Sequence, residues 1–178
     1  MRIISGELRG RQFNSPKGHR THPMGDRVRT ALFNTLGDIS GLTILDAFAG
    51  SGALTFEAIS RGARNAVTLE IDHDAYEVIQ QNANDLGIAD KINVQHINAR
   101  SWSYRNNTER FDIVFCDPPY NQLQETILEK LAKHAQIGGI LVYSMPPHGD
   151  IRLPMEKYEL ITTKTYGDAM LAFYRKLA

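Results

Sequence analysis

The sequence contains very little cysteine and no long hydrophobic run. Cys116 is its single cysteine, which excludes an internal disulfide framework and a multi-cysteine metal site. No apolar run reaches the roughly 18 residues of a membrane helix, and the N-terminus lacks the apolar core of a signal peptide. We therefore expect a cytoplasmic protein with no membrane segment.

Histidine is also sparse, and its spacing indicates no chemistry. None of the six histidines has a sequence neighbour that would suggest a metal site or a catalytic triad. We therefore expect no bound metal, and we interpret His73, His96, His134 and His148 as incidental. Cys116 lies inside an apolar run and is interpreted as a small core residue.

The net charge is zero, but the charges are unevenly distributed. Residues 1–30 contain seven cations and two acids, a balance of +5, and the rest of the chain carries the opposite balance of −5. A polyanion is drawn to such a basic segment by its electrostatic field. The segment thus indicates a nucleic-acid partner, although a solvated terminal arm has the same composition.

From residue 42 onward, short apolar runs alternate with segments of helical periodicity. Strands that are apolar on both faces and alternate with helices indicate a parallel sheet covered on both sides. The predicted strands span residues 42–48, 65–72, 92–97, 111–117 and 138–145. The apolar helical faces contain Leu54, Ala58 and Ile59, then Ala75, Ile79, Ala83 and Leu86, and then Leu123, Ile127, Leu128, Leu131 and Ala135.

Both ends of the chain depart from this alternation. Two strands, Lys157–Tyr166 and Ala169–Lys176, are predicted around a Gly167-Asp168 turn, so an antiparallel hairpin completes the sheet. Near the N-terminus, two short extended pieces precede a helix that begins at about Asp26, the expected N-cap, and ends at Gly37.

The expected organisation is one compact domain with a small addition. A basic N-terminal extension and helix occupy residues 1–37, and the α/β sheet domain occupies residues 38–178. At 178 residues the chain is long enough for one domain with a real core and too short for two ordinary domains.

The first predicted strand runs into a glycine-rich loop that starts at Asp46 and includes Gly50 and Gly52. Glycines let a backbone turn sharply and approach a ligand at the carboxyl end of a strand. Glu70 ends the next strand, where a carboxylate can accept hydrogen bonds from both ribose hydroxyls. Thr55 stands where a dinucleotide fingerprint needs glycine, and Asp46 suits a cationic aminoacyl group but not a pyrophosphate.

The glycine loop therefore predicts S-adenosylmethionine as the cofactor. After the third strand, Asn98 and Ala99 lie where a side-chain amide and the backbone could meet the adenine edge. The alternative is a tight turn in which Asp46 caps the following helix, and an ordinary turn at residues 98–99.

The most specific feature is Asp117-Pro118-Pro119-Tyr120, which follows the fourth predicted strand. Two prolines fix φ and remove two N–H donors, which leaves a rigid strand exit. The Asp117 carboxylate and the Pro118 carbonyl could accept both hydrogens of an exocyclic amino group and make its lone pair available for in-line attack on a sulfonium methyl group. Tyr120 offers a flat face on which an extracted base could stack. The alternative is a proline-rich loop that merely ends a strand.

These motifs lead to a known family. Over essentially its whole length the sequence resembles the RsmD family, the small-subunit ribosomal RNA guanine-N2 methyltransferases. The motifs that carry the resemblance are MRIISGELRGRQF at the N-terminus, Asp26-Arg27-Val28-Arg29 with Ala31-Leu32-Phe33-Asn34, the loop from Leu45 to Leu54 with Glu57-Ala58, Glu70-Ile71-Asp72, Asn98-Ala99 and Asp117-Pro118-Pro119-Tyr120. The sequence departs from the family between Arg20 and Asp26, where most members have Pro-Thr, and it is short between residues 145 and 157.

The resemblance implies a class I, Rossmann-like, S-adenosylmethionine-dependent methyltransferase with a seven-stranded sheet. It implies methylation of a guanine N2 amino group in 16S ribosomal RNA, on an assembled or assembling small ribosomal subunit. We expect a monomer. The candidate catalytic residues are Asp117, Pro118, Pro119 and Tyr120; the candidate cofactor contacts are Asp46, Phe48, Gly50, Gly52, Glu70, Ile71, Asn98 and Ala99; and the candidate RNA contacts are Arg2, Arg9, Arg11, Lys17, Arg20 and Arg27.

Three other functions are compatible with parts of the sequence. A DNA adenine-N6 methyltransferase would use the same Asp117–Tyr120 loop, but such enzymes usually carry a target-recognition domain for which this chain has little room. A small-molecule methyltransferase would need neither this loop nor the basic segment. A non-catalytic RNA-binding module in ribosome assembly would not need Asp117.

Overall fold

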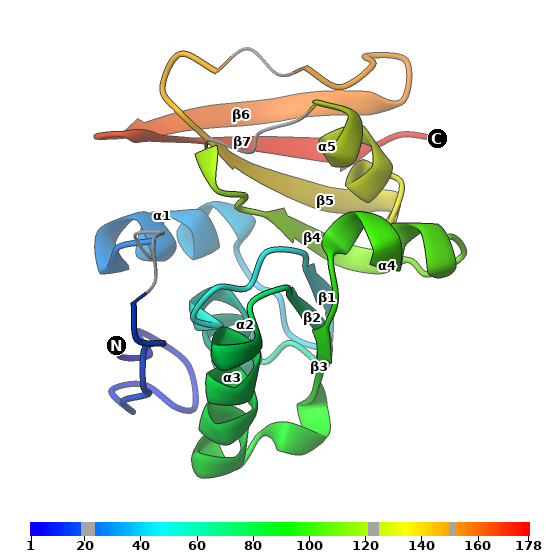
Figure 1. Ribbon diagram of the computed structural model, residues 1–178. Helices are drawn as coiled ribbons and strands as arrows, with labels where there is room; N and C mark the ends of the chain where they lie inside the picture. Colours follow the sequence, from blue (N-terminus) through cyan, green and yellow to red (C-terminus); the bar gives the residue numbers. More distant parts are fainter. Residues whose placement is uncertain (19–23, 121–124, 150–151) are drawn as a thin grey trace.

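The computed structural model describes residues 1–18, 24–120, 125–149 and 152–178. A seven-stranded sheet in the order β3-β2-β1-β4-β5-β7-β6 forms its centre, with helices on both faces (Figure 1). The helices are α1 (Asp26–Leu36), α2 (Ala53–Ser60), α3 (His73–Leu86), the 3-10 turn η1 (Ala89–Lys91), α4 (Ala99–Arg105) and α5 (Glu125–Ala132). The strands are β1 (Thr43–Asp46), β2 (Asn65–Glu70), β3 (Ile92–His96), β4 (Phe111–Cys116), β5 (Ala135–Met145), β6 (Tyr158–Tyr166) and β7 (Ala169–Lys176).

The pairing confirms the predicted fold class. Strands β1 to β5 pair in parallel, whereas β7 pairs antiparallel with both β5 and β6. The predicted hairpin at Gly167-Asp168 is therefore present, and β6 forms an edge of the sheet. The described parts of the link between β5 and β6 contain turns and no helix.

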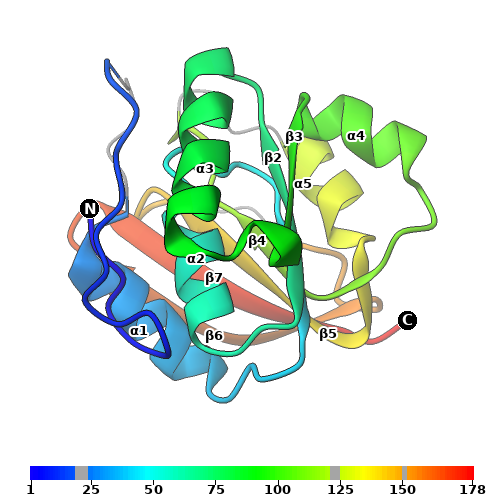
Figure 2. The ribbon, with the colours of Figure 1, turned by 90° about the horizontal axis from the view of Figure 1, so that it is seen from below.

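Two apolar layers lie on opposite faces of the sheet. Helices α1, α2 and α3 cover one face, and α4 and α5 cover the other (Figures 1 and 2). Because successive strand residues point to opposite faces, Ile44 packs in the first layer and Leu45 in the second, and both are fully buried. Within the described residues, no helix is long and apolar enough to cross a membrane.

Two local predictions were wrong, and one helix was missed. Gly25, not Asp26, is the N-cap of α1, and the Asp26 carboxylate instead pairs with arginines. Ala135 begins β5 rather than ending a helical face, because α5 stops at Ala132. Helix α4 was not predicted, since it is only 7 residues long and its main apolar anchor is Trp102.

The N-terminal arm (residues 1–18) is packed against the helices of the first face. Gly6 lies directly on α2: a Cβ atom there would be 1.9 Å from the Ser60 carbonyl oxygen, and its φ is +85°. The buried Glu57 carboxylate accepts a hydrogen bond of 2.8 Å from the Ile4 N–H. The arm is therefore part of the packed structure rather than a solvated tail.

Arg29 ties the arm to α1 and α2 from inside the protein. Its guanidinium donates to the Arg2 carbonyl at 2.8 Å and to the Asp26 carboxylate at 3.0 Å, and it lies 3.7 Å from the Glu57 carboxylate. The Arg29 side chain is fully buried. One of the seven cations in residues 1–30 is thus structural, so the outward positive charge of this segment is smaller than the sequence predicts.

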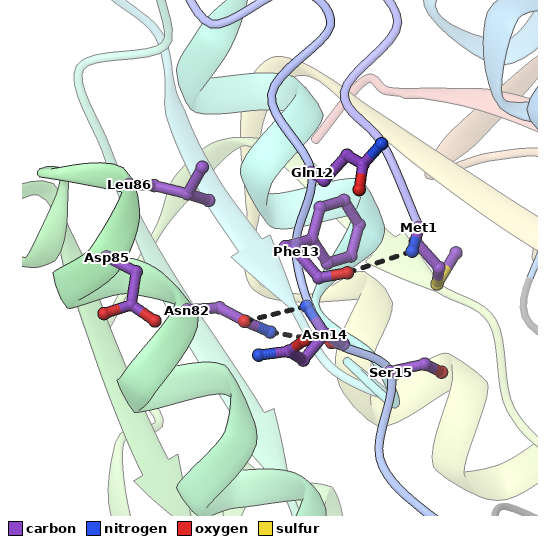
Figure 3. A pocket seen from close by; sticks show the side chains of 8 residues that line it. All are labelled: Met1, Gln12, Phe13, Asn14, Ser15, Asn82, Asp85 and Leu86. Carbon is purple, nitrogen blue, oxygen red and sulfur yellow. Dashed lines mark hydrogen bonds between the residues drawn. The ribbon is translucent and has the colours of Figure 1, made fainter.

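A recess of about 270 Å³ lies between the N-terminal arm and α3 (Figure 3). The buried Asn82 amide holds the arm there, because it accepts from the Asn14 N–H at 3.0 Å and donates to the Asn14 carbonyl at 2.8 Å. The recess contains none of the predicted cofactor or catalytic residues; it is lined by Met1, Gln12, Phe13, Asn14, Ser15, Asn82, Asp85 and Leu86.

His134 is not incidental, contrary to the sequence interpretation. Its side chain is fully buried in the second layer, with Nδ1 2.9 Å from the Glu109 carbonyl and Nε2 2.8 Å from the Ser103 hydroxyl. Its ring packs on Trp102 at a centroid distance of 4.9 Å. His134 therefore links α4, the loop before β4 and the end of α5.

The burial of His134 predicts a loss of stability in acid. Burial lowers the pKa of this imidazole from 6.5 to about 4. Between pH 6.5 and about 4, His134 is protonated in the unfolded chain but neutral in the folded protein. Stability therefore falls as the pH falls through this range. We expect this to lower the free energy of unfolding, measured with urea, by up to about 3 kcal/mol.

The matched variant is His134→Asn, whose amide can still donate to the Glu109 carbonyl but does not titrate. It should lack this component of the pH dependence. Identical pH dependence in the two proteins would contradict the assignment.

Candidate active site

The strand register brings three carboxylates to one edge of the sheet. Asp46 pairs with Thr68 of β2 and with Phe115 of β4. Glu70 and Asp117 each lie two residues beyond those partners, so all three acids meet at the carboxyl ends of parallel strands. Their charges interact, because both Asp117 and Glu70 raise the pKa of Asp46.

Asp46 is a fully buried carboxyl group with an incomplete set of partners. Its Oδ2 accepts a hydrogen bond of 2.8 Å from the Thr55 hydroxyl, but its Oδ1 has no hydrogen-bond partner among the described residues. Burial is the largest cause that raises the pKa of Asp46 to about 7, while Thr55 and the nearby Phe48 N–H lower it. The Phe48 N–H makes no hydrogen bond of normal geometry to Oδ1. A buried acid of this kind favours a cationic ligand group at its free oxygen.

The glycine loop folds tightly between β1 and α2. Gly52 has φ +77°, and a Cβ atom there would lie 2.9 Å from the Phe56 ring. Gly50 donates its N–H to Glu70 Oε2 at 2.7 Å. The loop is therefore attached to the acid at the end of β2, and the two predicted parts of the cofactor site form one structure.

Glu70 and its neighbour are suited to a ribose and an adenine. Glu70 Oε1 accepts from the Asp72 N–H at 2.8 Å, which leaves further lone pairs on both of its oxygens. Ile71 is a large apolar side chain that is 63% exposed, and Phe48 is half-buried. Ile71, exposed directly after the buried Glu70, could form an apolar surface against which an adenine ring packs.

Asn98 has a structural role that the sequence did not predict. Its Oδ1 caps α4 by accepting from the N–H of Arg100 at 2.9 Å. Ala99 is buried at the first position of that helix. Both residues lie at the predicted edge, since Ile97 donates its N–H to the Glu70 carbonyl at 3.0 Å.

The Asp117–Tyr120 loop leaves β4 beside the glycine loop. Burial raises the pKa of Asp117, and hydrogen bonding from the Ser144 side chain partly opposes this rise. Pro118 is buried, Pro119 is half-buried, and Tyr120 is 38% exposed. The loop therefore presents an acid whose pKa is raised by burial and an accessible aromatic ring.

Ser144 near the end of β5 is a residue of this site that sequence reasoning missed. Its hydroxyl oxygen is 3.0 Å from the Tyr120 hydroxyl oxygen. Its position could have been found from the strand pattern, because Ser144 is a polar residue in an otherwise apolar run. The space around Asp117 and Ser144 is otherwise largely apolar; its lining also includes Met24, Leu32, Leu54, Phe115, Cys116, Val142 and Leu171.

The predicted RNA contacts are exposed where the structure describes them, whereas Arg20 lies outside the described residues. Arg2 pairs with Asp26 at 3.1 Å, and Arg11 donates to the Asp85 carbonyl at 3.0 Å. The described residues contain no group of three or more His, Cys, Asp or Glu side chains that could hold a metal ion. The remaining exposed cations of the set are Arg9, Lys17 and Arg27.

The sheet order, with a glycine loop after β1 and an antiparallel last pair, is that of the class I methyltransferases. The structure of the Escherichia coli protein yhhF, described as a proposed methyltransferase, matches with a TM-score of 0.88 at 32% identity over 100% of this chain and 98% of that chain. The structure of SMU.776, described as a methyltransferase in complex with SAH, matches with a TM-score of 0.70, over 84% of this chain and 48% of that chain. At 12% identity this second likeness shows the fold alone.

The sequence profile of the family described as Conserved hypothetical protein 95 matches residues 1–175. The chain belongs to this family, and the predicted resemblance to the RsmD family is confirmed. The "Ribosomal RNA small subunit methyltransferase D" of Haemophilus influenzae is 32% identical over 98% of this chain and 93% of its own length. The protein of the same name from Escherichia coli strain K12 is 41% identical over 71% of this chain and 65% of its own length.

The environment of Asp46 predicts an unusual titration in the free protein. We expect the Asp46 carboxyl carbon, followed by NMR, to titrate near pH 7, because burial raises this pKa to about 7. Asp117→Asn removes a repelling charge and should lower the pKa, whereas Thr55→Val removes a hydrogen bond and should raise it. Asp38 serves as an internal reference, since its pKa is lowered by Ser40. An ordinary aspartate pKa at Asp46 would contradict this account.

Proposed function

We propose that this protein is an S-adenosylmethionine-dependent methyltransferase that acts on the exocyclic N2 amino group of a guanine in small-subunit ribosomal RNA. The observation that carries the proposal is the group of three acids at one edge of the sheet. Asp46 and Glu70 flank the glycine loop, and Asp117 faces the same edge from the next strand.

The first two acids fit the cofactor. Asp46 offers a buried oxygen without a partner to the cationic aminoacyl part, and Glu70 offers acceptor lone pairs to the ribose hydroxyls. The tight turn at Gly52 keeps the backbone close to this ligand. Ile71, Asn98 and Ala99 lie where the adenine ring would sit. S-adenosylmethionine supplies an electrophilic methyl group there, carried by a positively charged sulfur.

The third acid prepares the nucleophile. An exocyclic amino nitrogen attacks poorly, because its lone pair is delocalised into the base. Asp117 and the Pro118 carbonyl accept its two hydrogens and hold the nitrogen in line with the methyl group. Bound S-adenosylmethionine would supply the methyl carbon and leave as a neutral thioether, and the proton lost by the nitrogen would pass to the Asp117 carboxylate. Tyr120 holds the base by stacking on its exposed ring.

The relatives support the choice of substrate. Those from Haemophilus influenzae and Escherichia coli are named as methyltransferases of the ribosomal RNA small subunit. We infer the same RNA here and, from the family resemblance, guanine N2 as the atom and an assembled or assembling small subunit as the acceptor. The exposed cations of the arm, among them Arg9 and Arg11, are proposed to bind its phosphates.

The start of α1 and the catalytic loop lie close enough to act together. Met24, just before α1, lines the same space as Asp117 and Ser144. The cations on the first turn of α1, such as Arg27, are therefore near the proposed target base. Phosphate contacts here would position the RNA, and the pocket would select the base.

The decisive experiment is transfer of a radiolabelled methyl group to small-subunit particles from cells that lack the enzyme. We expect label in guanine N2. Asp117→Ala should lower transfer by at least about a thousandfold, because it removes an acceptor that acts in the transition state, while affinity for S-adenosylmethionine stays nearly unchanged. Asp90→Ala, an exposed acid before β3, should behave as wild type.

The other outcomes separate the alternatives. Label in adenine of DNA would favour the adenine-N6 reaction, and label in a small molecule would favour a metabolite substrate. Binding to the particles without any transfer would favour a non-catalytic assembly module. Loss of cofactor binding in Asp117→Ala would show that the loop is wrongly assigned.

The arm generates a second prediction. Replacing Arg9 and Arg11 by alanine should weaken RNA binding and reduce the slope of log affinity against log salt by about 1.5, because two phosphate contacts are lost. The matched control is Arg64→Ala, an exposed cation at the opposite, amino end of β2. Unchanged affinity and unchanged salt dependence in the double variant would rule out this role.

A further inference from the structure

Ser144 lies beside Asp117 at the end of the neighbouring strand. Cys116 of β4 pairs with Tyr143 of β5 in parallel register, so the next residues on the two strands are Asp117 and Ser144. Ser144 is only 4% exposed. It lines the same space as the half-buried Asp117, so the two residues lie side by side where β4 and β5 end.

The Ser144 hydroxyl interacts with two members of the catalytic loop. Its oxygen is 3.0 Å from the Tyr120 hydroxyl oxygen. It also lowers the pKa of Asp117 by hydrogen bonding, which opposes the effect of burial on that acid. Ser144 therefore connects the proposed acceptor of the amino group to the proposed stacking ring.

Counting hydrogens gives this connection a direction. An ionised carboxylate only accepts hydrogen bonds, and a serine hydroxyl has one hydrogen to donate. When Ser144 donates this hydrogen to Asp117, the Tyr120 hydroxyl, 3.0 Å from the Ser144 hydroxyl, is left to donate to Ser144. The result is a chain from the Tyr120 hydroxyl through Ser144 to the Asp117 carboxylate.

This chain of hydrogen bonds restricts the side chains of Asp117 and Tyr120, which are the first and last residues of the catalytic loop. A carboxylate held from one side by Ser144 has fewer orientations available, and it keeps acceptor capacity for an incoming N–H. A tyrosine anchored by its hydroxyl keeps its ring face in one position. The surrounding side chains offer little replacement, because Leu54 and Leu171 in the lining of this space are apolar.

We propose that Ser144 is a positioning residue that orients Asp117 and Tyr120 as one unit toward the amino group of the target base. This role rests on the proposed methyl transfer. It acts through Asp117 and does not require Ser144 to touch the base, the cofactor or the methyl group.

The test uses the full-length protein, S-adenosylmethionine and small-subunit particles from cells that lack the enzyme. We expect Ser144→Ala to lower kcat about 10- to 100-fold, since it removes a hydrogen bond to a charged group, with little change in the KM for S-adenosylmethionine. Ser144→Thr keeps the hydroxyl and should restore most of the rate. A second variant, Tyr120→Phe, removes the other hydroxyl. Its matched control is Tyr104→Phe, since Tyr104 is a tyrosine on α4 that is 85% exposed.

Two further measurements separate positioning from a merely structural role. Without Ser144 the pKa of Asp117 rises, so the acid limb of the kcat/KM profile should move to higher pH in Ser144→Ala. Tyr120→Phe keeps the aromatic ring and removes the hydroxyl that hydrogen-bonds to Ser144. The losses in Ser144→Ala and Tyr120→Phe should therefore be less than additive in the double variant.

Each outcome decides between the two proposals. A wild-type rate and pH profile in Ser144→Ala, with Asp117→Ala inactive, would overturn the role of Ser144 and leave the proposed function intact. Additive losses without a shift of the acid limb would also overturn it. No transfer by the wild-type protein would instead overturn the proposed function. If Ser144→Ala does not fold, unchanged kcat in Tyr120→Phe would contradict the chain.

Discussion

Parallel pairing of β1 with both β2 and β4 is the constraint on which the site depends. Parallel strands end at the same edge, and the register places Glu70 and Asp117 two residues beyond the partners of Asp46. No loop has to be long or specially shaped to bring these acids together. The hydrophobic layers on both faces keep the strands in place, and the candidate site lies where the strands end.

The same packing buries the Asp46 carboxylate where the parallel strands end, which has an electrostatic cost. Asp46 is fully buried and accepts one hydrogen bond from Thr55, and its second oxygen has no hydrogen-bond partner in the described part of the chain. A buried carboxylate without a counter-charge is destabilising, which is why its pKa rises. A cationic ligand would relieve this cost, so the arrangement favours binding over stability of the free protein.

Much of this architecture could be predicted, because strong periodic signals determine it. The apolar runs predicted the strands, and the residues predicted for the site at Asp46, Glu70 and Asp117 lie at one edge of the sheet. Where signals were short or shared between elements, prediction failed. Helix α4 has few turns to show a periodicity, and Ala135 suits a strand as well as a helix.

The remaining surprises are contacts between residues distant in sequence. His134 acquires its role only when α4, α5 and the loop before β4 meet around it. Arg29 looked like one more surface cation, yet its partner Glu57 comes from another helix. Ser144 has no motif of its own, and its position next to Asp117 follows from the pairing of β4 with β5. Such roles depend on tertiary packing, which no local pattern contains.

Because the N-terminal arm is held at two points, it would fix the distance along an RNA between the phosphates that it binds and the nucleotide at the site. Glu57 binds the arm at Ile4 and Asn82 binds it at Asn14, so Arg9 and Arg11 between these points are fixed relative to the sheet. A strand of RNA held by these cations would meet the site at a fixed contour distance. A nucleotide would then be selected by its spacing from the bound phosphates as well as by its base.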